Sequence, residues 1–146
     1  MHITLESDYA IRIVLFLLQY GKRADAKKIS ENTGVTLRFS LRILRKLVAA
    51  GVVRSYKGAS GGYEAAKAPS EISLADIMAV TEGIYCLSRC LEAEDGCAHS
   101  DCSCKVREAF GEISGMVRQK LSEFTFDKLI CGGCGPRSSG SEEEHA

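Results

Sequence analysis

The feature that most restricts the fold is a pair of helical segments joined by a turn of only a few residues. Asp25 can cap a helix over 26–32, Gly34 can end it, and Thr36 can cap the next helix over 37–50. Two helices joined so closely form a helix-turn-helix. The sequence therefore predicts this motif in the N-terminal half of the chain.

Two strand-like runs, 52–56 and 63–66, follow the motif directly on either side of a glycine-rich tip. Short β-like runs around glycines indicate a hairpin, and a hairpin in this position is a wing. The tip carries Lys57 and little bulk, which suits approach to a phosphate backbone or a minor groove. We therefore expect a mainly α fold with a small β-hairpin wing, that is, a winged helix-turn-helix domain.

The helix over 37–50 has two faces of opposite character. Arg38, Arg42 and Arg45 lie at i, i+4 and i+7, so they are expected to line one face. A solvated basic face and a DNA-binding face are equally compatible with this stripe alone. Four apolar residues recur at helical spacing and are expected to pack inward beside Ile43 and Leu47. They are Leu37, Leu41, Leu44 and Val48.

The charge distribution favours the DNA-binding interpretation of that stripe. Residues 1–70 carry twelve Lys and Arg against five Asp and Glu, a net charge of +7. Residues 71–146 carry seven against fourteen, a net charge of −7. This division indicates that the first half contacts a polyanion and the second half does not.

A buried first helix is expected over 5–20, with Glu6 and Asp8 in its first turn and Gly21 at its end. The richest apolar run inside it, 11–18, is too short to span a bilayer. The chain also shows no pattern of a signal peptide. We therefore expect a cytosolic, cytoplasmic protein without membrane contact.

A long helix is expected over 105–129, and it would measure about 37 Å at 1.5 Å per residue. Its apolar residues follow a spacing close to that of a coiled coil, so they need a partner surface. An intrachain core could supply that surface, but the same helix of a second chain is favoured because two-fold dimers dominate among oligomers. The stripe consists of Val106, Phe110, Ile113, Val117, Leu121 and Phe124.

These segments divide the chain into four parts. A winged-helix DNA-binding domain is expected over 1–83, and it ends with a helix that a capping box at Ser73 opens. A cysteine-rich loop follows over 84–104, and the dimerisation helix occupies 105–130. The composition of the tail, 131–146, predicts disorder.

Seven cysteines in a chain expected to be cytosolic indicate metal binding or redox chemistry, because disulfides are disfavoured in a reducing compartment. Five of them lie between Cys86 and Cys104. Cys90, Cys97 and Cys104 are separated by six residues each, whereas zinc sites usually show two close cysteine pairs. Widely spaced soft thiolates on a loop favour an iron–sulfur cluster, with zinc as the alternative.

Five stretches together resemble a known family: 8–12 (DYAIR), 44–53 (LRKLVAAGVV), 57–63 (KGASGGY), 71–77 (EISLADI) and Glu82-Gly83. They are similar to the IscR/NsrR-type family of bacterial winged-helix regulators, over residues 1 to about 130. The resemblance implies a two-fold dimer on a palindromic double-stranded DNA operator, with the third helix in the major groove and the wing tip in the minor groove.

The resemblance and the basic face together give a set of DNA-binding candidates. The sequence departs from the family pattern at Lys57, where an arginine is frequent, and at Ser40, where a leucine is common. The full set is Thr36, Arg38, Ser40, Arg42, Arg45, Lys57, Ser60, Gly61 and Gly62.

The family holds an iron–sulfur cluster with three cysteines, which the resemblance matches to Cys90, Cys97 and Cys104. Asp8 stands where one branch uses an aspartate ligand, although an acid at a helix N-terminus is an equally good interpretation. A histidine ligand of another branch is replaced by Arg107, which cannot ligate. Both a [2Fe–2S] and a [4Fe–4S] cluster stay open. The alternate ligands are Cys86, His99 and Cys102.

The sequence thus predicts a transcription regulator, a repressor or an activator, whose operator affinity is controlled by an iron–sulfur cluster. A winged-helix regulator with a zinc site or a thiol/disulfide switch is the second hypothesis. A small iron–sulfur electron carrier is the third, and it would have no use for the basic stripe. No nucleophile–base pair or nucleotide loop is found, so no enzyme activity is expected. Cys131 and Cys134 are expected to form a peripheral thiol pair or an accessory metal contact.

Overall fold

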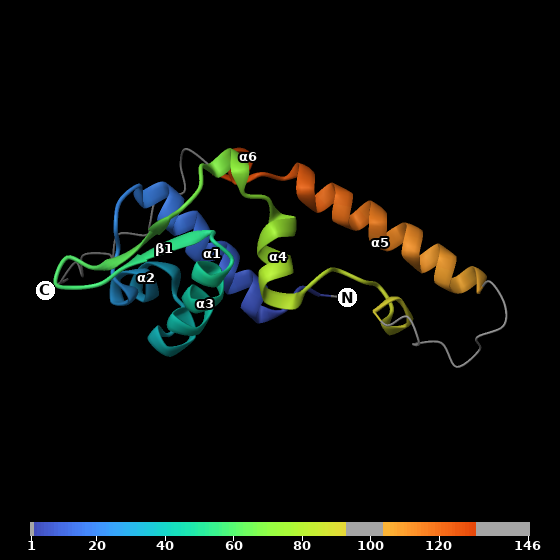
Figure 1. The fold of residues 1–146 in the computed structure, drawn as a ribbon, viewed down its shortest axis with the longest axis horizontal. Helices are drawn as coiled ribbons and strands as arrows, with labels where there is room; N and C mark the ends of the chain where they lie inside the picture. The colour runs from blue at the N-terminus through green and yellow to red at the C-terminus, as the bar shows by residue number, and fades with distance from the viewer. Residues whose placement is uncertain (1, 93–103, 131–146) are drawn as a thin grey trace, which may run out of the picture.

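The computed structural model describes residues 2–92 and 104–130, and it places a winged-helix domain beside one long, projecting helix (Figure 1). The tail 131–146, including Cys131 and Cys134, lies outside the described residues. The elements in chain order are α1 (Leu5–Tyr20), α2 (Ala26–Thr33), α3 (Leu37–Ala49), β1 (Val53–Tyr56), β2 (Gly62–Ala65), η1 (Pro69–Glu71), α4 (Leu74–Glu82), η2 (Arg89–Leu91), α5 (Lys105–Glu123) and α6 (Phe126–Leu129).

Local capping explains where the helices of the motif begin and end. The carboxylate of Asp25 accepts a hydrogen bond from the Lys28 amide at 2.7 Å and so caps α2 as predicted. Gly34 ends α2 with a φ of 70°, in the left-handed region that favours glycine. Thr36 stands at the start of α3, but its side chain makes no capping hydrogen bond, and the residue is exposed.

The core forms around α1, which contacts α2, α3 and α4. Ile13, Ile43 and Leu47 are fully buried there, and their burial removes large apolar side chains from water. The inward face of α3 differs from the prediction, because it is formed by Ser40, Ile43, Leu44 and Leu47. Leu37, by contrast, is 45% exposed, and Leu41 is only half-buried.

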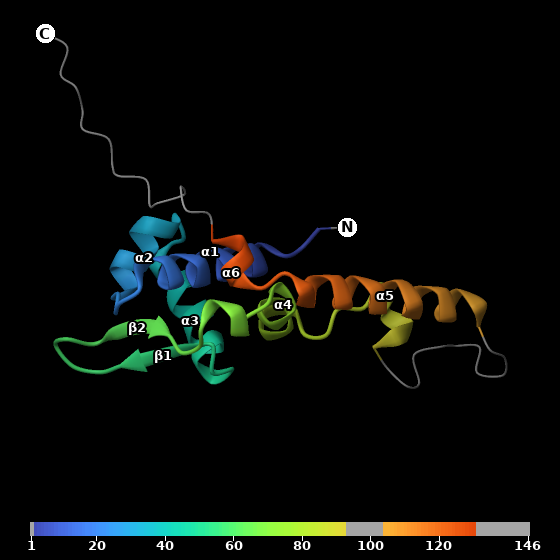
Figure 2. The ribbon, with the colours of Figure 1, turned by 90° about the horizontal axis from the view of Figure 1, so that it is seen from above.

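The wing is a two-stranded antiparallel hairpin whose register pairs Val53 with Ala65 and Tyr56 with Gly62 (Figure 2). Its second strand, β2, is also joined to the turn before α2, because Ala24 exchanges two backbone hydrogen bonds with Tyr63, at 3.0 and 2.8 Å. A Cβ atom on Gly62 would lie 2.8 Å from the Ala24 carbonyl oxygen, so this close approach requires glycine.

The long C-terminal helix is shorter than the sequence predicted. It ends at Glu123, and its 19 residues correspond to about 28 Å. The break has a clear cause: the Phe124 carbonyl accepts a hydrogen bond from the Leu74 amide, and the Phe126 amide donates to the Ile72 carbonyl at 2.9 Å. Phe126, on the short helix α6, is completely buried in the core of the winged-helix domain.

The predicted apolar stripe of α5 divides between two sides of the helix. Phe110, Val117 and Leu121 are half-buried, and Val117 and Leu121 lie beside Met78 of α4 and Tyr85 after it. Val106 and Ile113 are 59% and 44% exposed, and Met116 and Phe124 are also largely exposed. Part of the stripe therefore packs within the chain, as the alternative interpretation proposed, and part remains open.

Within the described part of the chain, no helix combines the length and the apolar character that crossing a membrane requires.

Candidate DNA-binding surface and cysteine segment

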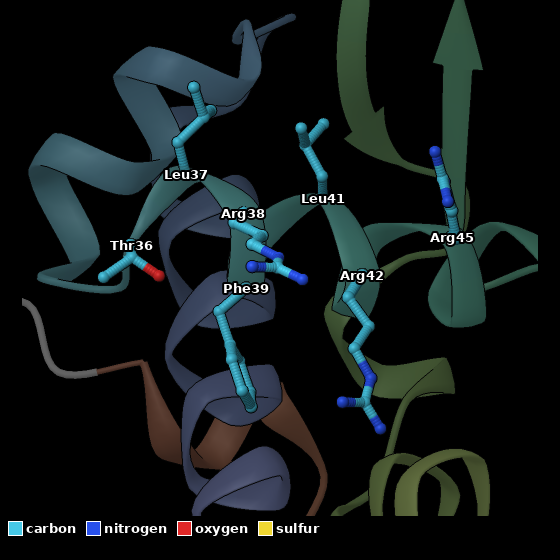
Figure 3. Close-up of a pocket in the computed structure, with 7 residues that line it drawn as sticks. All are labelled: Thr36, Leu37, Arg38, Phe39, Leu41, Arg42 and Arg45. Carbon is cyan, nitrogen blue, oxygen red and sulfur yellow. The ribbon is translucent and has the colours of Figure 1, made fainter.

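The three arginines predicted to form a basic stripe are exposed on α3. They do not all point the same way: Figure 3 shows Arg42 and Arg45 directed to opposite sides of the helix, with Arg38 one turn before Arg42. Arg45 points toward the wing strand, whereas Arg42 points toward α1 and α4. Its neighbour Phe39 packs edge-on against Tyr9 of α1, with 5.5 Å between the ring centroids. Cations are thus spread across the width of α3, as a surface that contacts a polyanion requires.

Two leucines on the same surface were not anticipated. Leu37 and Leu41 line an open groove together with the three arginines and point away from the core (Figure 3). Helical spacing alone could not reveal this, because the apolar residues of α3 are numerous enough to support more than one inward face. Apolar side chains that are exposed or partly exposed between arginines are suited to contact thymine methyl groups in a major groove.

Ser40 is a correction to the predicted set of DNA contacts. Its side chain is fully buried, and its hydroxyl donates a hydrogen bond to the Val35 carbonyl at 3.3 Å. Ser40 therefore stabilises the turn between α2 and α3 and is not available to DNA. Thr36 remains exposed at the start of α3.

The tip of the wing presents Lys57 and Ser60 as exposed side chains. Gly61 is needed for the shape of the tip, since a Cβ atom there would lie 2.5 Å from the Tyr56 carbonyl oxygen. Gly61 and Gly62 therefore serve the conformation of the wing, and any DNA contact they make would be through the backbone.

A further cation beside the tip of the wing was missed by the sequence analysis. The Arg23 guanidinium stacks on the Tyr56 ring at 3.4 Å from its centroid and lies 3.8 Å from a Glu64 carboxylate oxygen. The Tyr56 hydroxyl also donates a hydrogen bond to that carboxylate. This contact joins the turn before α2 to both strands of the wing, so it fixes the wing relative to the helix-turn-helix.

Cys90 and Cys104 stand at either side of 93–103, which lies outside the described residues together with Cys97, His99 and Cys102. Cys90 and Cys104 carry free, half-buried thiols, as does Cys86. Cys104 is the N-terminal flanking residue of α5, and Cys90 lies on η2. Within 2–92 and 104–130, no three histidine, cysteine or acidic side chains gather into a possible metal site.

The segment that carries Cys86 and Cys90 is attached to α5 by direct contacts. The buried Ser114 hydroxyl accepts a hydrogen bond from the Leu87 amide at 2.9 Å, and Arg118 donates to the Tyr85 carbonyl at 3.2 Å. The Leu91 side chain lies on Gly111, where an added Cβ atom would be 3.7 Å from it. Both described ends of the cysteine loop are therefore held on the same helix.

Asp8, the fourth predicted ligand, is on α1 and forms an ion pair with Arg12 at 2.8 Å. Its side chain is 38% exposed, so the carboxylate is accessible. It does not join the described cysteines of its own chain in a three-residue group.

A helix-turn-helix with an exposed basic third helix and an adjoining wing defines the winged-helix class of DNA-binding proteins. The chain belongs to the Rrf2 family, described as "Iron-dependent Transcriptional regulator", whose model matches residues 3–132. The resemblance to IscR/NsrR-type regulators predicted from the sequence is thereby confirmed, as is the fold class. Relatives and structural neighbours are named as transcriptional regulators, in line with the expectation of a regulator and not of an enzyme.

Individual relatives agree with this family. Protein aau3 of Rhizobium meliloti is 30% identical over 132 residues, which are 89% of this chain and 85% of that protein. Among solved structures, CymR, the global cysteine regulator of B. subtilis, has a TM-score of 0.72 at 24% identity, covering 89% of this chain and 96% of CymR. IscR of T. potens has a TM-score of 0.73 at 20% identity, covering 89% and 86%. Both structures share the fold with this chain.

Proposed function

We propose that this transcription regulator binds a palindromic operator as a homodimer, with an affinity controlled by a cysteine-ligated iron–sulfur cluster. Cys90, Cys97 and Cys104 would ligate the cluster, and Asp8 would be the fourth ligand. The observation that carries the proposal is that Cys90 and Cys104 are held on α5, the helix whose other end leads into Phe126 in the core of the DNA-binding domain.

The DNA contacts are proposed to come from α3 and the wing. Arg38, Arg42 and Arg45 would lie in or beside the major groove, and Lys57 and Ser60 would approach the minor groove or the backbone. The exposure of all five side chains supports this assignment, as does the contact of Arg23 with Tyr56, which holds the strands of the wing next to its tip.

Dimerisation is proposed to cover the open part of the apolar stripe on α5. Val106, Ile113 and Met116 are between 44% and 63% exposed, and Ile84, on the adjoining segment, is 74% exposed. Large apolar side chains exposed together indicate an interaction surface. A second copy of α5 is the proposed occupant because a two-fold dimer would match a palindromic operator.

The donor chemistry of the cysteine segment fits an iron–sulfur cluster. The described thiols are soft ligands, and two of them border a loop that contributes a third, Cys97. When bound, a cluster supplies a link between thiolates that oxidants or nitric oxide can break. Because Asp8 does not join the described cysteines of its own chain, we propose that it serves the thiols of the partner subunit.

Anaerobic purification followed by iron and sulfide analysis and visible absorption tests the proposal. We expect bound iron and sulfide with visible bands in the wild type, and loss of both in Cys90→Ser, Cys97→Ser and Cys104→Ser. Cys86→Ser is the matched control, and it should keep the chromophore. A triple-serine variant that binds iron and sulfide normally would contradict the assignment.

A thiol switch or a zinc site is the second candidate. It is favoured by the surplus thiol of Cys86 and by the fold shared with CymR, a cysteine regulator. A colourless wild type with one bound zinc per chain, or with thiols that titrate reversibly, would support this candidate and overturn the cluster.

A further inference from the structure

A carboxylate lies directly behind the DNA-binding helix. Glu6, in the first turn of α1, has a side chain that is only 16% exposed. The Lys46 ammonium nitrogen lies 2.8 Å from its Oε1 atom, and Arg42 Nε lies 3.7 Å from the same oxygen. Arg42 and Lys46 are one helical turn apart on α3, so a single carboxylate restrains two of the cations that this helix carries.

The position of Glu6 is itself fixed by α4. The Thr4 amide and the Thr4 hydroxyl both donate to Oε1 of Glu82, at 2.9 Å each. The hydroxyl of Ser7, which is fully buried, also donates to this carboxylate. Because residues on both sides of Glu6 are tied to the end of α4, the backbone that carries Glu6 cannot move away from α3 without breaking these hydrogen bonds.

A partly buried negative charge at this place has two physical consequences for DNA binding. It neutralises cations that would otherwise contact phosphates of any sequence. It also repels a DNA phosphate that approaches that edge of α3. This repulsion disfavours non-specific complexes, in which base contacts do not compensate for it. Arg38 and Arg45, by contrast, have no ion pair among those found in the described residues.

We propose that Glu6 is a specificity-determining residue that restrains Arg42 and Lys46 and so suppresses binding to non-specific DNA. This inference rests on the proposed contact between α3 and DNA, and it is independent of the cluster. Glu6 acts through the two cations it holds, so it is a positioning residue and need not touch DNA.

The test compares Glu6→Gln with Glu31→Gln, which removes the same charge from an exposed ion pair with Lys27 on α2. Affinities of the full chain are measured at several salt concentrations, for a mixed-sequence duplex and for a duplex that the wild type selects from a random pool. Releasing cations to phosphates should make Glu6→Gln bind the mixed-sequence duplex about tenfold more tightly at low salt, with a salt slope steeper by about one. The ratio of specific to non-specific affinity should fall, whereas Glu31→Gln should change neither quantity comparably.

Glu6→Asp provides a second variant, because it keeps the charge and should keep the wild-type salt slope even if Glu6→Gln proves unstable in thermal melts. The inference is overturned if Glu6→Gln behaves like Glu31→Gln, if it weakens both duplexes equally, or if Glu6→Asp acquires the steeper slope. A wild type that selects no duplex at all would instead refute the proposed DNA contact on which the inference rests.

Discussion

Replacing Phe126 with alanine should strongly destabilise the winged-helix domain, although this residue lies beyond the long helix. Phe126 is fully buried, and a phenylalanine side chain removes about 160 Å² from water, equivalent to about 4 kcal/mol at about 25 cal/mol per Å². Because the substitution also leaves a cavity, we expect the free energy of unfolding to fall by about 3–5 kcal/mol. That is a large share of the stability of an ordinary domain.

Urea denaturation followed by circular dichroism, at several protein concentrations, measures this loss. Phe126→Leu is the matched control, because it retains most of the apolar volume and should lose less than about 1.5 kcal/mol. A Phe126→Ala protein within about 1 kcal/mol of the wild type would refute the conclusion that α6 belongs to the core. If α6 is a structural anchor, Phe126→Ala should also change the operator affinity of the dimer.

Three further outcomes are expected. If Arg38 reads a base, Arg38→Ala should lose about 1–3 kcal/mol of discrimination between duplexes in DNA-binding titrations. If Arg38 contacts a phosphate, the salt slope should instead fall by about one, and an unchanged affinity for every duplex would remove Arg38 from the interface. Ile113→Asp should give monomers or aggregates by light scattering, since a charge would be placed on the proposed dimer surface, and a clean dimer would disprove that assignment. Burial alone would raise the pKa of Glu82, but hydrogen bonds from Ser7 and Thr4 outweigh burial and lower its pKa below the usual 4.5. Its stabilising effect is therefore present above pH 4.5 and lost as the pH falls below that value, so the melting-temperature difference between wild type and Glu82→Gln should shrink in acid.

Both ends of α2 could be predicted from the sequence because they depend on local chemistry, whereas the cap predicted at Thr36 does not form. Gly34 adopts the left-handed conformation that ends α2, and Asp25 caps it, as the residue types indicate. The orientation of α3 could not be predicted in the same way. Leu37 is exposed while Ser40 is buried, because the serine hydroxyl finds a backbone acceptor at Val35 that no periodicity reveals.

Contacts between residues far apart in the chain account for the other differences. The long helix stops early because backbone groups of Phe124 and Phe126 pair with Leu74 and Ile72 at the start of α4, fifty or more residues earlier in the sequence. Glu6 was interpreted only as an acid at a helix N-terminus, since nothing in its local sequence indicates Lys46 as its partner. Of the four ligands predicted first, the structure describes Asp8, Cys90 and Cys104 but not Cys97, and all four ligand assignments remain predictions.

The most direct test of cluster control is an anaerobic comparison of operator affinity between cluster-loaded and cluster-free protein. The duplex is one selected in vitro by the wild type, and the Cys90/Cys97/Cys104 triple-serine variant serves as a second cluster-free sample. We predict that the loaded wild type differs in operator affinity by about fivefold or more from its cluster-free form, and that the triple variant matches the cluster-free form. Equal affinities for all three samples, or a wild type that never holds iron and sulfide, would contradict control by a cluster.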